Sequence, residues 1–530
     1  MFFDSRRSNI LATNGMVATS QPLAATTGLR ILMEGGNAVD AAIAAAAALN
    51  VVEPMSTGVG GDMFALVWDN KEKSVRALNG SGRAPAAASI DELKSKGHRT
   101  MPETGVYSVA TPGTVHGWET LLDSCGTMPL SRVLAPAIDY AENGFPVSDI
   151  ISFQWQQQLA KLSAFPSGTE MLPNGGTPSQ GDFVKLPTLA STLRAIAEGG
   201  SEAFYKGPIA EKTCAFVQEH GGWLSVDDMA THTSDWDEPI STDYRGVTCW
   251  ECPPNGQGIA ALGALNIAEG FDIRGMGAQS PDAYHHLIEA MRLGFADAFQ
   301  YVADPRKANV PIKELTSKDF AITRRALMDS KKAMATVPYG QVLNGSDTVY
   351  ISVVDGQGNA CSFINSVFTN FGSGMVVPGT GIVLHNRASL FSLDPNHANH
   401  LAPHKRPYNT IIPGMATIDD ELHLSYGMMG AFMQPQGHLQ LISNMVDHDM
   451  DPQQAINALR FMVGNDNVIL EEGLDPAVAR DLQSRGHKVG QITGYNRVSI
   501  GGAQMIKRDP DTGVLTGASE PRKDGCAVGY

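Results

Sequence analysis

Thr348 lies in surroundings that suit a nucleophile which the chain generates by cutting itself. Residues 344–347 read Asn-Gly-Ser-Asp, a turn-forming composition, and residues 349–354 alternate as a strand does. If the chain were cut between Asp347 and Thr348, the threonine hydroxyl would become the nucleophile. The new α-amine, which titrates near neutrality, would be the adjacent base. The alternative is a turn that leads into an ordinary strand, because Asp-Thr is a common dipeptide.

A nucleophile of this kind attacks a carbonyl carbon, so the developing oxyanion needs hydrogen-bond donors. The segment 427–431, Gly-Met-Met-Gly-Ala, precedes an expected helix and could present backbone N–H groups to that oxygen. The same glycines could instead serve only the backbone geometry of a turn.

The element that must position Thr348 is a predicted β-hairpin. Residues 349–354 form its first strand, residues 355–359 (Asp-Gly-Gln-Gly-Asn) its turn, and residues 360–368 its second strand. Thr348 therefore lies at the outer end of the hairpin. No glycine in this region belongs to a GxGxxG motif after a strand, so a dinucleotide-binding fold is not expected.

The remaining elements predict mixed α and β layers. Asn37 and Asp40 have N-cap and N3 spacing ahead of a small-residue helix at 38–50, and a strand follows at 63–68. The region 115–340 is predicted to be largely helical, and its apolar residues from Leu287 to Ala298 follow helical spacing in one long amphipathic helix. The C-terminal region is predicted to contain strands at 421–426 and 498–506 and helices at 435–447 and 452–461. This order favours an α+β protein.

The composition is that of a globular protein with two domains or one large layered unit. The chain has 530 residues, of which 43% are hydrophobic and 18% charged, and its formal net charge is −16. The acidic balance argues against nucleic acid and anionic membranes as partners. The first residues show no secretory signal, and six cysteines are too few for a disulfide scaffold. We therefore expect a cytoplasmic protein.

Three groups of side chains have spacings that metal sites also use. They are Cys249 with Cys252; His285 and His286 with Glu289; and His397, His400 and His404. The first is a CxxC without a second pair, the second begins a helix, and the third lies in a Pro- and Asn-rich loop. Structural roles are favoured for all three groups, and no metal or cofactor is expected.

Several long blocks of the sequence, in one order, resemble the γ-glutamyltransferase (γ-glutamyltranspeptidase) family of N-terminal-nucleophile hydrolases. The resemblance covers essentially the whole chain. Within the family the chain is most similar to the branch of oxamate amidohydrolase and γ-glutamyltransferase-like proteins, which residues 433–438 (Met-Gln-Pro-Gln-Gly-His) also fit. The blocks are residues 14–68, 347–363, 370–386, 405–413 and 518–530.

The resemblance implies an αββα sandwich with a largely helical region in the large subunit. It also implies self-cleavage into a large subunit, 1–347, and a small subunit, 348–530, which together form one composite unit. Thr348 would be the nucleophile and Ser366 the hydroxyl residue that supports it. The paired oxyanion glycines of the family fall on Gly430 and Ala431, where alanine keeps the N–H but narrows the permitted backbone angles.

The residues that recognise a γ-glutamyl group in the family are replaced at three positions. The acidic residue that holds the α-ammonium corresponds to Leu390, a glutamine corresponds to Arg387, and an asparagine corresponds to Phe368. A leucine cannot offset the cost of desolvating an ammonium group. Tight binding of a free glutamyl head group is therefore not expected.

A site for a carboxylate is retained according to the same resemblance. The serine pair that contacts the α-carboxylate corresponds to Asn409 and Thr410, which are still polar. The arginine that pairs with that carboxylate corresponds to Arg83, displaced by two positions. A surface arginine in a loop is the other interpretation of Arg83.

The sequence thus leads to the hypothesis of an autoprocessed amidohydrolase that acts on a small, carboxylate-bearing, oxamate-like amide. The alternatives are a γ-glutamyl hydrolase or transferase that acts on glutathione or similar compounds, a cephalosporin-acylase-like amidase, and a non-catalytic metal-binding protein. The expected partners are the small-molecule substrate and the two subunits of one precursor, without nucleic acid or membrane. Assembly of two such heterodimers into a homodimer stays open.

Overall fold

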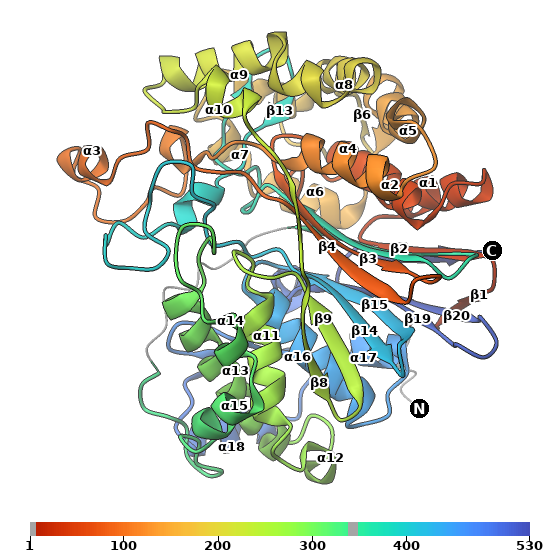
Figure 1. Ribbon diagram of the computed structural model, residues 1–530, viewed down its shortest axis with the longest axis vertical. Helices are drawn as coiled ribbons and strands as arrows, with labels where there is room; N and C mark the ends of the chain where they lie inside the picture. The colour runs from red at the N-terminus through yellow and green to blue at the C-terminus, as the bar shows by residue number, and fades with distance from the viewer. Residues whose placement is uncertain (1–6, 338–347) are drawn as a thin grey trace.

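Two antiparallel β-sheets stack face to face at the centre of the molecule, and helices cover the outer face of each (Figure 1). The computed structural model describes residues 7–337 and 348–530. Asp347, the first residue of the expected cleavage site, lies outside the described residues. The arrangement confirms the predicted α+β class and the αββα sandwich.

Each sheet combines strands from both halves of the chain. In spatial order, sheet I contains β21 (Cys526–Gly529), β2 (Gly15–Thr19), β10 (Val349–Asp355), β11 (Ala360–Ser366), β3 (Asp62–Asp69), β4 (Ser74–Gly80) and β7 (Asp235–Asp237). Sheet II contains β1 (Ile10–Ala12), β20 (Leu515–Ser519), β19 (Gly502–Arg508), β15 (Glu421–Met429), β14 (Pro413–Ile418), β9 (Val247–Glu251) and β8 (Ile240–Tyr244). The hairpin β10–β11 is inserted between β2 and β3, so neither half of the chain forms sheet I by itself.

Residue alternation along β10 explains its burial on both faces. Val349, Ile351 and Val353 belong to the apolar cluster under the helices, whereas Tyr350 and Val354 belong to the cluster between the sheets. Successive side chains of a strand point to opposite faces. Thr348 has the parity of Tyr350, so its side chain faces the space between the two sheets.

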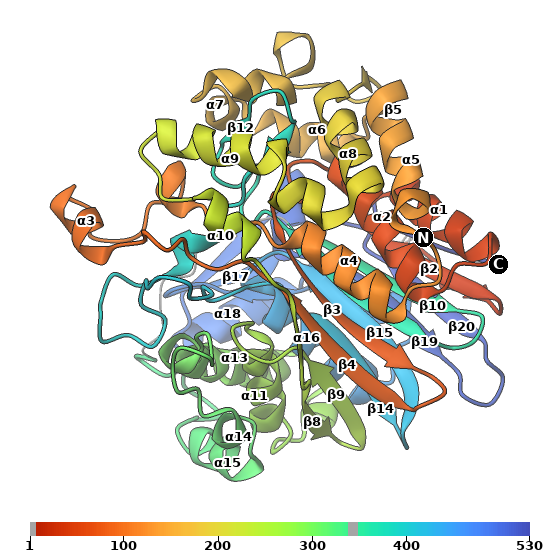
Figure 2. The same ribbon diagram turned by 45° about the horizontal axis from the view of Figure 1, so that its top comes forward.

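The helices over sheet I pack closely because their contact faces carry small residues. Every residue of α2 is buried, and Asn37 with Asp40 forms the predicted capping box at its N-terminus. Figure 2 shows α4 lying across β3 and β4. This layer contains α1 (Pro22–Met33), α2 (Ala38–Val52), α4 (Thr114–Cys125), α5 (Leu130–Asn143), α6 (Asp149–Gln156), α7 (Leu159–Leu162), α8 (Pro187–Tyr205), α9 (Pro208–Glu219) and α10 (Val226–Ala230), with α3 (Ile90–Ser95) at one side.

The helices under sheet II include the long amphipathic helix that the sequence indicates. Its apolar residues from Leu287 to Ala298 are buried against the neighbouring helices and the sheet. This layer contains α11 (Gly258–Ala268), α12 (Ile273–Met276), α13 (Pro281–Tyr301), α14 (Ile312–Leu315), α15 (Lys318–Arg325), α16 (Met433–Val446), α17 (Pro452–Asn457) and α18 (Pro476–Ser484).

The region 115–340 is largely helical, as predicted, with the short strands β7, β8 and β9 within it. Two local boundary predictions were wrong. The strand expected at 498–506 is β19 and begins at Gly502, after a 3₁₀ segment, η5 (Gly494–Ile500). Helix α17 ends at Asn457 rather than 461, because Phe461 pairs in β16 and its N–H donates to Gln440 of α16.

The smaller sheets complete the fold. They are β5 (Phe145–Pro146) with β6 (Phe183–Val184), β12 (Val376–Val377) with β13 (Ile382–Val383), and β16 (Phe461–Val463) with β17 (Val468–Glu471) and β18 (Val489–Ile492). Among the described residues, none of the helices is both long enough and apolar enough to cross a membrane.

Candidate active site

The candidate nucleophile lies beside the residue expected to support it. Val349 pairs with Asn365 across the hairpin, so the preceding residue, Thr348, lies next to Ser366. The Oγ1 of Thr348 donates to the Oγ of Ser366 at 3.2 Å, and the backbone N–H of Phe368 donates to the same oxygen at 2.8 Å. Both hydroxyl side chains are fully buried. Ser366 therefore holds the Thr348 hydroxyl in one orientation.

The turn between β15 and α16, formed by Gly430 and Ala431, has the backbone of an anion-binding loop. The φ angles are +122° at Gly430 and +46° at Ala431, both in the region that favours glycine. In the described part of the chain, neither N–H donates to a protein acceptor. Two successive free N–H groups are what an oxyanion requires. We call these two residues the β15–α16 turn.

Contacts between the sheets place this turn near Thr348. Ser352 Oγ donates to Ser425 Oγ at 2.7 Å across the gap between the sheets. The ring of Tyr350 packs on Gly427, where an added Cβ would lie 2.4 Å from it. Ser352 faces Ser425 and Tyr350 faces Gly427, so residue numbers fall along β10 as they rise along β15. By the same spacing, Thr348 faces the end of β15 at Met429. Gly427 thus serves sheet packing, and the free N–H groups belong to the β15–α16 turn.

Gln257, just before α11, connects the turn to the segment 408–410. Its side-chain Nε2 donates to the carbonyl oxygens of Thr410, at 2.7 Å, and Ala431, at 2.9 Å. Its Oε1 accepts from the hydroxyl of Tyr408 at 3.1 Å, and its backbone N–H donates to Asn409 O at 3.0 Å. Sequence reasoning missed Gln257, because a glutamine in a Gly- and Pro-rich turn carries no distinguishing local signal.

Arg387 lies in η4 (Arg387–Leu390) and is completely buried. Its guanidinium donates to Thr410 Oγ1 at 2.7 Å and to Asp62 Oδ2 at 3.3 Å, and lies 4.6 Å from the centre of the Phe368 ring. The remaining terminal nitrogen has no hydrogen-bond partner among the described residues. Burial lowers the pKa of Arg387 to about 10, against the opposing effect of Asp62, so the group stays cationic at neutral pH.

Asp62 is a buried carboxylate that the sequence did not single out. Its Oδ1 accepts the N–H of Gly82 at 2.9 Å, and its Oδ2 lies 3.4 Å from His385 Nδ1 and 3.4 Å from Asn409 Nδ2. Burial alone would raise the pKa of Asp62, but His385, Arg387 and the Gly82 hydrogen bond lower it below its usual value. The ionised Asp62 therefore balances the charge of Arg387 inside the protein. Only its place at the start of β3 could have indicated this role.

The predicted substrate residues Arg387, Asn409 and Thr410 thus meet at one place, whereas Arg83 is engaged elsewhere. The Arg83 guanidinium donates to Asp235 at 3.0 Å and to the carbonyl oxygen of Thr233 at 3.1 Å. Among the described residues, no hydrogen bond joins it to the Arg387 group. A role for Arg83 in binding substrate stays a prediction.

Two of the histidines among the candidate metal ligands form hydrogen bonds to carbonyl oxygens of the protein. His285 Nε2 lies 2.8 Å from Asp329 O, and His400 Nδ1 lies 2.8 Å from His397 O. Cys249 and Cys252 are free thiols that pack in two different apolar clusters. In residues 7–337 and 348–530, no group of three or more His, Cys, Asp or Glu side chains is arranged to hold a metal ion.

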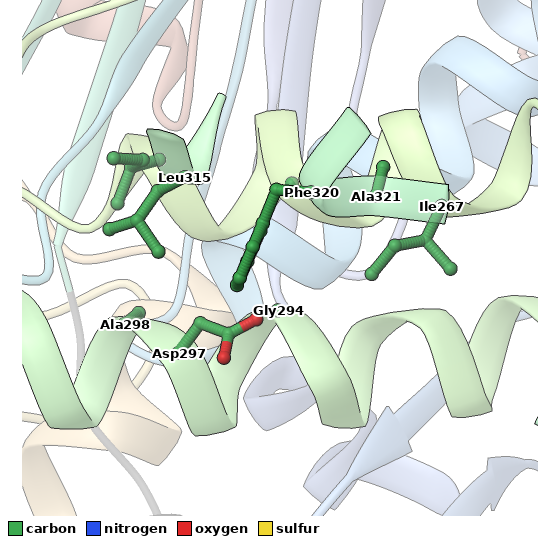
Figure 3. Close-up of a pocket in the computed structure, with 9 residues that line it drawn as sticks. Ile267, Gly294, Asp297, Ala298, Leu315, Phe320 and Ala321 are labelled. Carbon is green, nitrogen blue, oxygen red and sulfur yellow. The ribbon is translucent and has the colours of Figure 1, made fainter. Parts of the chain in front are cut away.

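A small pocket between the helices under sheet II lies away from these residues (Figure 3). Phe320 and Leu315 form its apolar wall, and Asp297 points into it from α13. Burial raises the pKa of Asp297 to about 6, partly opposed by Arg324 at 3.0 Å. The pocket contains no nucleophile or oxyanion donor, so it is not a candidate for the catalytic centre.

Comparison with known proteins shows the family of the chain. The model of the family described as gamma-glutamyltranspeptidase matches residues 24–530. The glutathione hydrolase-like YwrD proenzyme of Bacillus subtilis is 37% identical over 98% of this chain and 99% of its own, and the oxamate amidohydrolase proenzyme of Klebsiella pneumoniae is 34% identical over 99% and 100%. The crystal structure of cephalosporin acylase from Bacillus halodurans superposes with a TM-score of 0.94, at 44% identity, over 100% of this chain and 98% of that one.

Proposed function

The chain belongs to the γ-glutamyltranspeptidase family and is an amide hydrolase of the N-terminal-nucleophile type, and from this premise we propose its substrate class and maturation. The chain is made as a precursor and cut between Asp347 and Thr348. The resulting large subunit, 1–347, and small subunit, 348–530, stay together and hydrolyse a small amide that bears a carboxylate. The observation that carries the proposal is the buried guanidinium of Arg387, which has one nitrogen without a hydrogen-bond partner among the described residues. It packs on the ring of Phe368, whose N–H donates to the Ser366 oxygen beside Thr348.

The proposed reaction forms an ester on Thr348 and then hydrolyses it. The α-amine of Thr348 takes the hydroxyl proton while Oγ1 attacks the amide carbon. The N–H groups of the β15–α16 turn hold the resulting oxyanion. The C–N bond then breaks, and the amine or ammonia leaves with the transferred proton. Water, deprotonated by the same α-amine, hydrolyses the Thr348 ester and releases the acid.

Arg387 and Thr410 select the acyl group. A substrate carboxylate would accept hydrogen bonds from the free nitrogen of Arg387 and from the polar groups beside it, and charge-assisted bonds are the strong ones. Leu390 offers no partner for an ammonium group, which disfavours a γ-glutamyl head group. A buried arginine already balanced by Asp62 binds a further anion without a large reorganisation.

The relatives support the proposal at the level of reaction type and differ in substrate. One is named for oxamate, one is glutathione hydrolase-like, and one is a cephalosporin acylase. The identity of 44% to the acylase structure makes an acylase of larger amides the second candidate. Hydrolysis or transfer of γ-glutamyl compounds is the third, and release of p-nitroaniline from γ-glutamyl-p-nitroanilide at ordinary efficiency would overturn our interpretation of Leu390.

Cleavage is tested on denaturing gels. The wild-type protein should give two bands whose masses place the cut before Thr348, and Thr348→Ala should give one inactive chain. Gel filtration should show that the two wild-type subunits remain together, because β10 and β11 lie between β2 and β3 in sheet I. A wild-type protein that is active as one intact chain would contradict the proposal.

The substrate class is tested by amine or ammonia release from a panel of amides. The panel contains oxamate, succinamate and glutamine, together with propionamide, which matches succinamate but lacks the carboxylate. We expect the carboxylate-bearing amides without an ammonium group to be hydrolysed best. If propionamide and succinamate were hydrolysed at equal rates, Arg387 would not have the role assigned to it.

A further inference from the structure

The segment 433–438 (Met-Gln-Pro-Gln-Gly-His) begins α16 one residue after the β15–α16 turn, and the proposed mechanism gives it no role. Its three polar side chains, Gln434, Gln436 and His438, are completely buried. Burying a polar group is costly unless the group is hydrogen-bonded, so the partners of these side chains show what the segment holds in place.

The two glutamines fix the start of α16 to two other segments. Oε1 of Gln434 accepts the N–H of Ile412, just before β14, at 2.9 Å. Oε1 of Gln436 accepts the N–H of Val463 in β16 at 2.6 Å. Nε2 of Gln436 also donates to the carbonyl oxygen of Phe432, at 3.0 Å. Both glutamines therefore bind backbone groups, as structural residues do.

His438 instead binds a buried carboxylate. Its Nδ1 lies 2.5 Å from Oε1 of Glu251, the last residue of β9, and both side chains are completely buried. In residues 7–337 and 348–530, neither Oε2 of Glu251 nor Nε2 of His438 has a hydrogen-bond partner. Burial raises the pKa of Glu251, and His438 opposes that effect. The carboxylate thus depends on His438 for its stabilisation.

The pair is one of two ties between the same two segments. One segment runs from the end of β9 to the start of α11, and the other runs from the β15–α16 turn into α16. Gln257 in the first segment donates to the carbonyl oxygen of Ala431 at 2.9 Å, and Glu251 in the same segment is bonded to His438. One tie therefore reaches the turn itself, and the other reaches the helix that follows it.

The hydrogen bonds at the start of α16 connect His438 to the turn. The N–H of Met433 donates to the carbonyl oxygen of Gly430 at 2.8 Å, and the N–H of Gln434 donates to that of Ala431 at 3.1 Å. The carbonyl groups of the turn are thus bonded to the helix, whose successive hydrogen bonds make it move as one element. A shift of α16 would therefore turn the peptide groups of Gly430 and Ala431.

We propose that Glu251 and His438 are positioning residues for the oxyanion donors. Their bond fixes α16 against the loop that carries Gln257, and thereby sets the direction of the N–H groups of Gly430 and Ala431. Both residues act through the helix, without contact to the substrate. This inference rests on the oxyanion role that the proposed function gives to the β15–α16 turn.

His438→Leu and His438→Asn separate the hydrogen bond from the size of the side chain. The two replacements are similar in size, but only asparagine has an amide that can bond to Glu251 where Nδ1 does. Loss of one oxyanion donor costs about 100- to 1,000-fold in kcat, and a displaced donor loses part of its effect. For the best-hydrolysed member of the amide panel, kcat should therefore fall about 30-fold in His438→Leu and less than about threefold in His438→Asn. KM should change little, because the carboxylate site is untouched.

A double variant separates positioning from stability. His438→Leu alone leaves the Glu251 carboxylate buried without a partner, which destabilises the fold. Glu251→Met combined with His438→Leu removes both polar groups, so the protein should be at least as stable as the wild type. Its kcat should nevertheless stay about 30-fold low, because the tie is missing. Denaturant unfolding measures the stability and steady-state kinetics measure kcat.

Gln440→Leu is the matched control on the same helix. Gln440 is bonded to Phe461 of β16 and not to the segment of Glu251. The control should lower the free energy of unfolding and leave kcat unchanged.

Three results would overturn the inference. They are a wild-type kcat in the folded double variant, equal deficits in His438→Leu and His438→Asn, and an equal fall of kcat in Gln440→Leu. Where a variant stays uncleaved, the rates of self-cleavage are compared in the same way, and His438→Asn should restore cleavage. A wild-type protein that hydrolyses no member of the panel would instead reject the proposed function.

Discussion

The hydroxyl of Thr348 donates to Ser366, whose oxygen also accepts the N–H of Phe368. A Ser366→Ala change removes the acceptor that orients the nucleophile and leaves a buried N–H without its partner. The loss of a buried hydrogen bond costs about 1–3 kcal/mol, so we expect kcat to fall by about 10- to 100-fold. Self-cleavage should slow as well, and both are measured on purified precursor and mature protein.

Ser362→Ala is the matched control for Ser366→Ala. Ser362 lies on the same strand and face, and its hydroxyl is bonded to Tyr350 rather than to the nucleophile. We expect this variant to lose stability with little change in kcat. An equal loss of kcat in the two variants would mean that Ser366 acts only through the packing of β11.

Arg387 supplies the second test at this scale. Arg387→Gln should raise KM for carboxylate-bearing amides by about 10- to 100-fold, because one charge-assisted hydrogen bond is worth about 1.5–3 kcal/mol. KM for propionamide should change little. Steady-state kinetics on the two substrates check this expectation.

The partner of Arg387 complicates this change, since Asp62 would remain buried without its cation. The double variant Asp62→Asn with Arg387→Gln removes both charges and should be the more stable of the two. It should still bind carboxylates poorly. Full affinity in the double variant would show that Arg387 does not contact the substrate.

At the scale of elements, Gln257 ties the start of α11 to the ends of two other segments. Gln257→Leu removes both hydrogen bonds of Nε2, to Thr410 and to Ala431. Ala431 has a positive φ, which costs a non-glycine residue about 1–2 kcal/mol and therefore needs support from its surroundings. We expect kcat to fall by at least about tenfold through loss of the oxyanion donors, with a smaller change in KM.

Tyr408→Phe is the control for Gln257→Leu, because it removes the bond to Oε1 and leaves those of Nε2. It should retain most of the kcat for the best-hydrolysed member of the amide panel. Equal losses in both variants would indicate that the whole segment, rather than the Ala431 carbonyl, is what Gln257 holds.

Some elements could be predicted from the local sequence pattern alone. The hairpin β10–β11, helix α2 and helix α13 follow from alternation, capping residues and helical spacing within each segment. The end of α17 does not, because Phe461 pairs in β16 and its N–H donates to Gln440 of α16. A contact between distant segments decided that boundary.

At the scale of the whole molecule, a buried histidine pair joins the two halves of the chain. His285 Nδ1 of α13 lies 2.9 Å from His487 Nε2, and Glu289 Oε2 accepts the N–H of Met334 at 2.8 Å. Burial, with His285 and Arg292, lowers the pKa of His487 to about 3. The folded protein therefore keeps His487 neutral over most of the acidic range.

Because of this pKa shift, the free energy of unfolding depends on pH. In the unfolded chain a histidine titrates near ~6.5, so between pH ~6.5 and ~3 the unfolded state binds a proton that the folded state does not. Stability should fall as the pH is lowered through this window and should not depend on His487 above it. Denaturant unfolding of His487→Gln should show a shallower acid dependence than the wild type, whereas exposed His220→Gln should follow the wild type.

By itself, the sequence identified the family and the α+β class and indicated a candidate nucleophile, because these depend on motifs and periodicities that lie within single segments. Thr348, Ser366, Gly430 and Ala431 were named as candidate site residues through the resemblance to the family. Only the tertiary structure showed that Arg387 is paired with Asp62, that Arg83 is engaged by Asp235, and that Gln257 supports Ala431. It also showed that Glu251 and His438 form a buried pair although they are far apart in the sequence. The physical reason is that charge pairing and cavities depend on which side chains meet across the fold, and spacing along the chain does not encode those meetings.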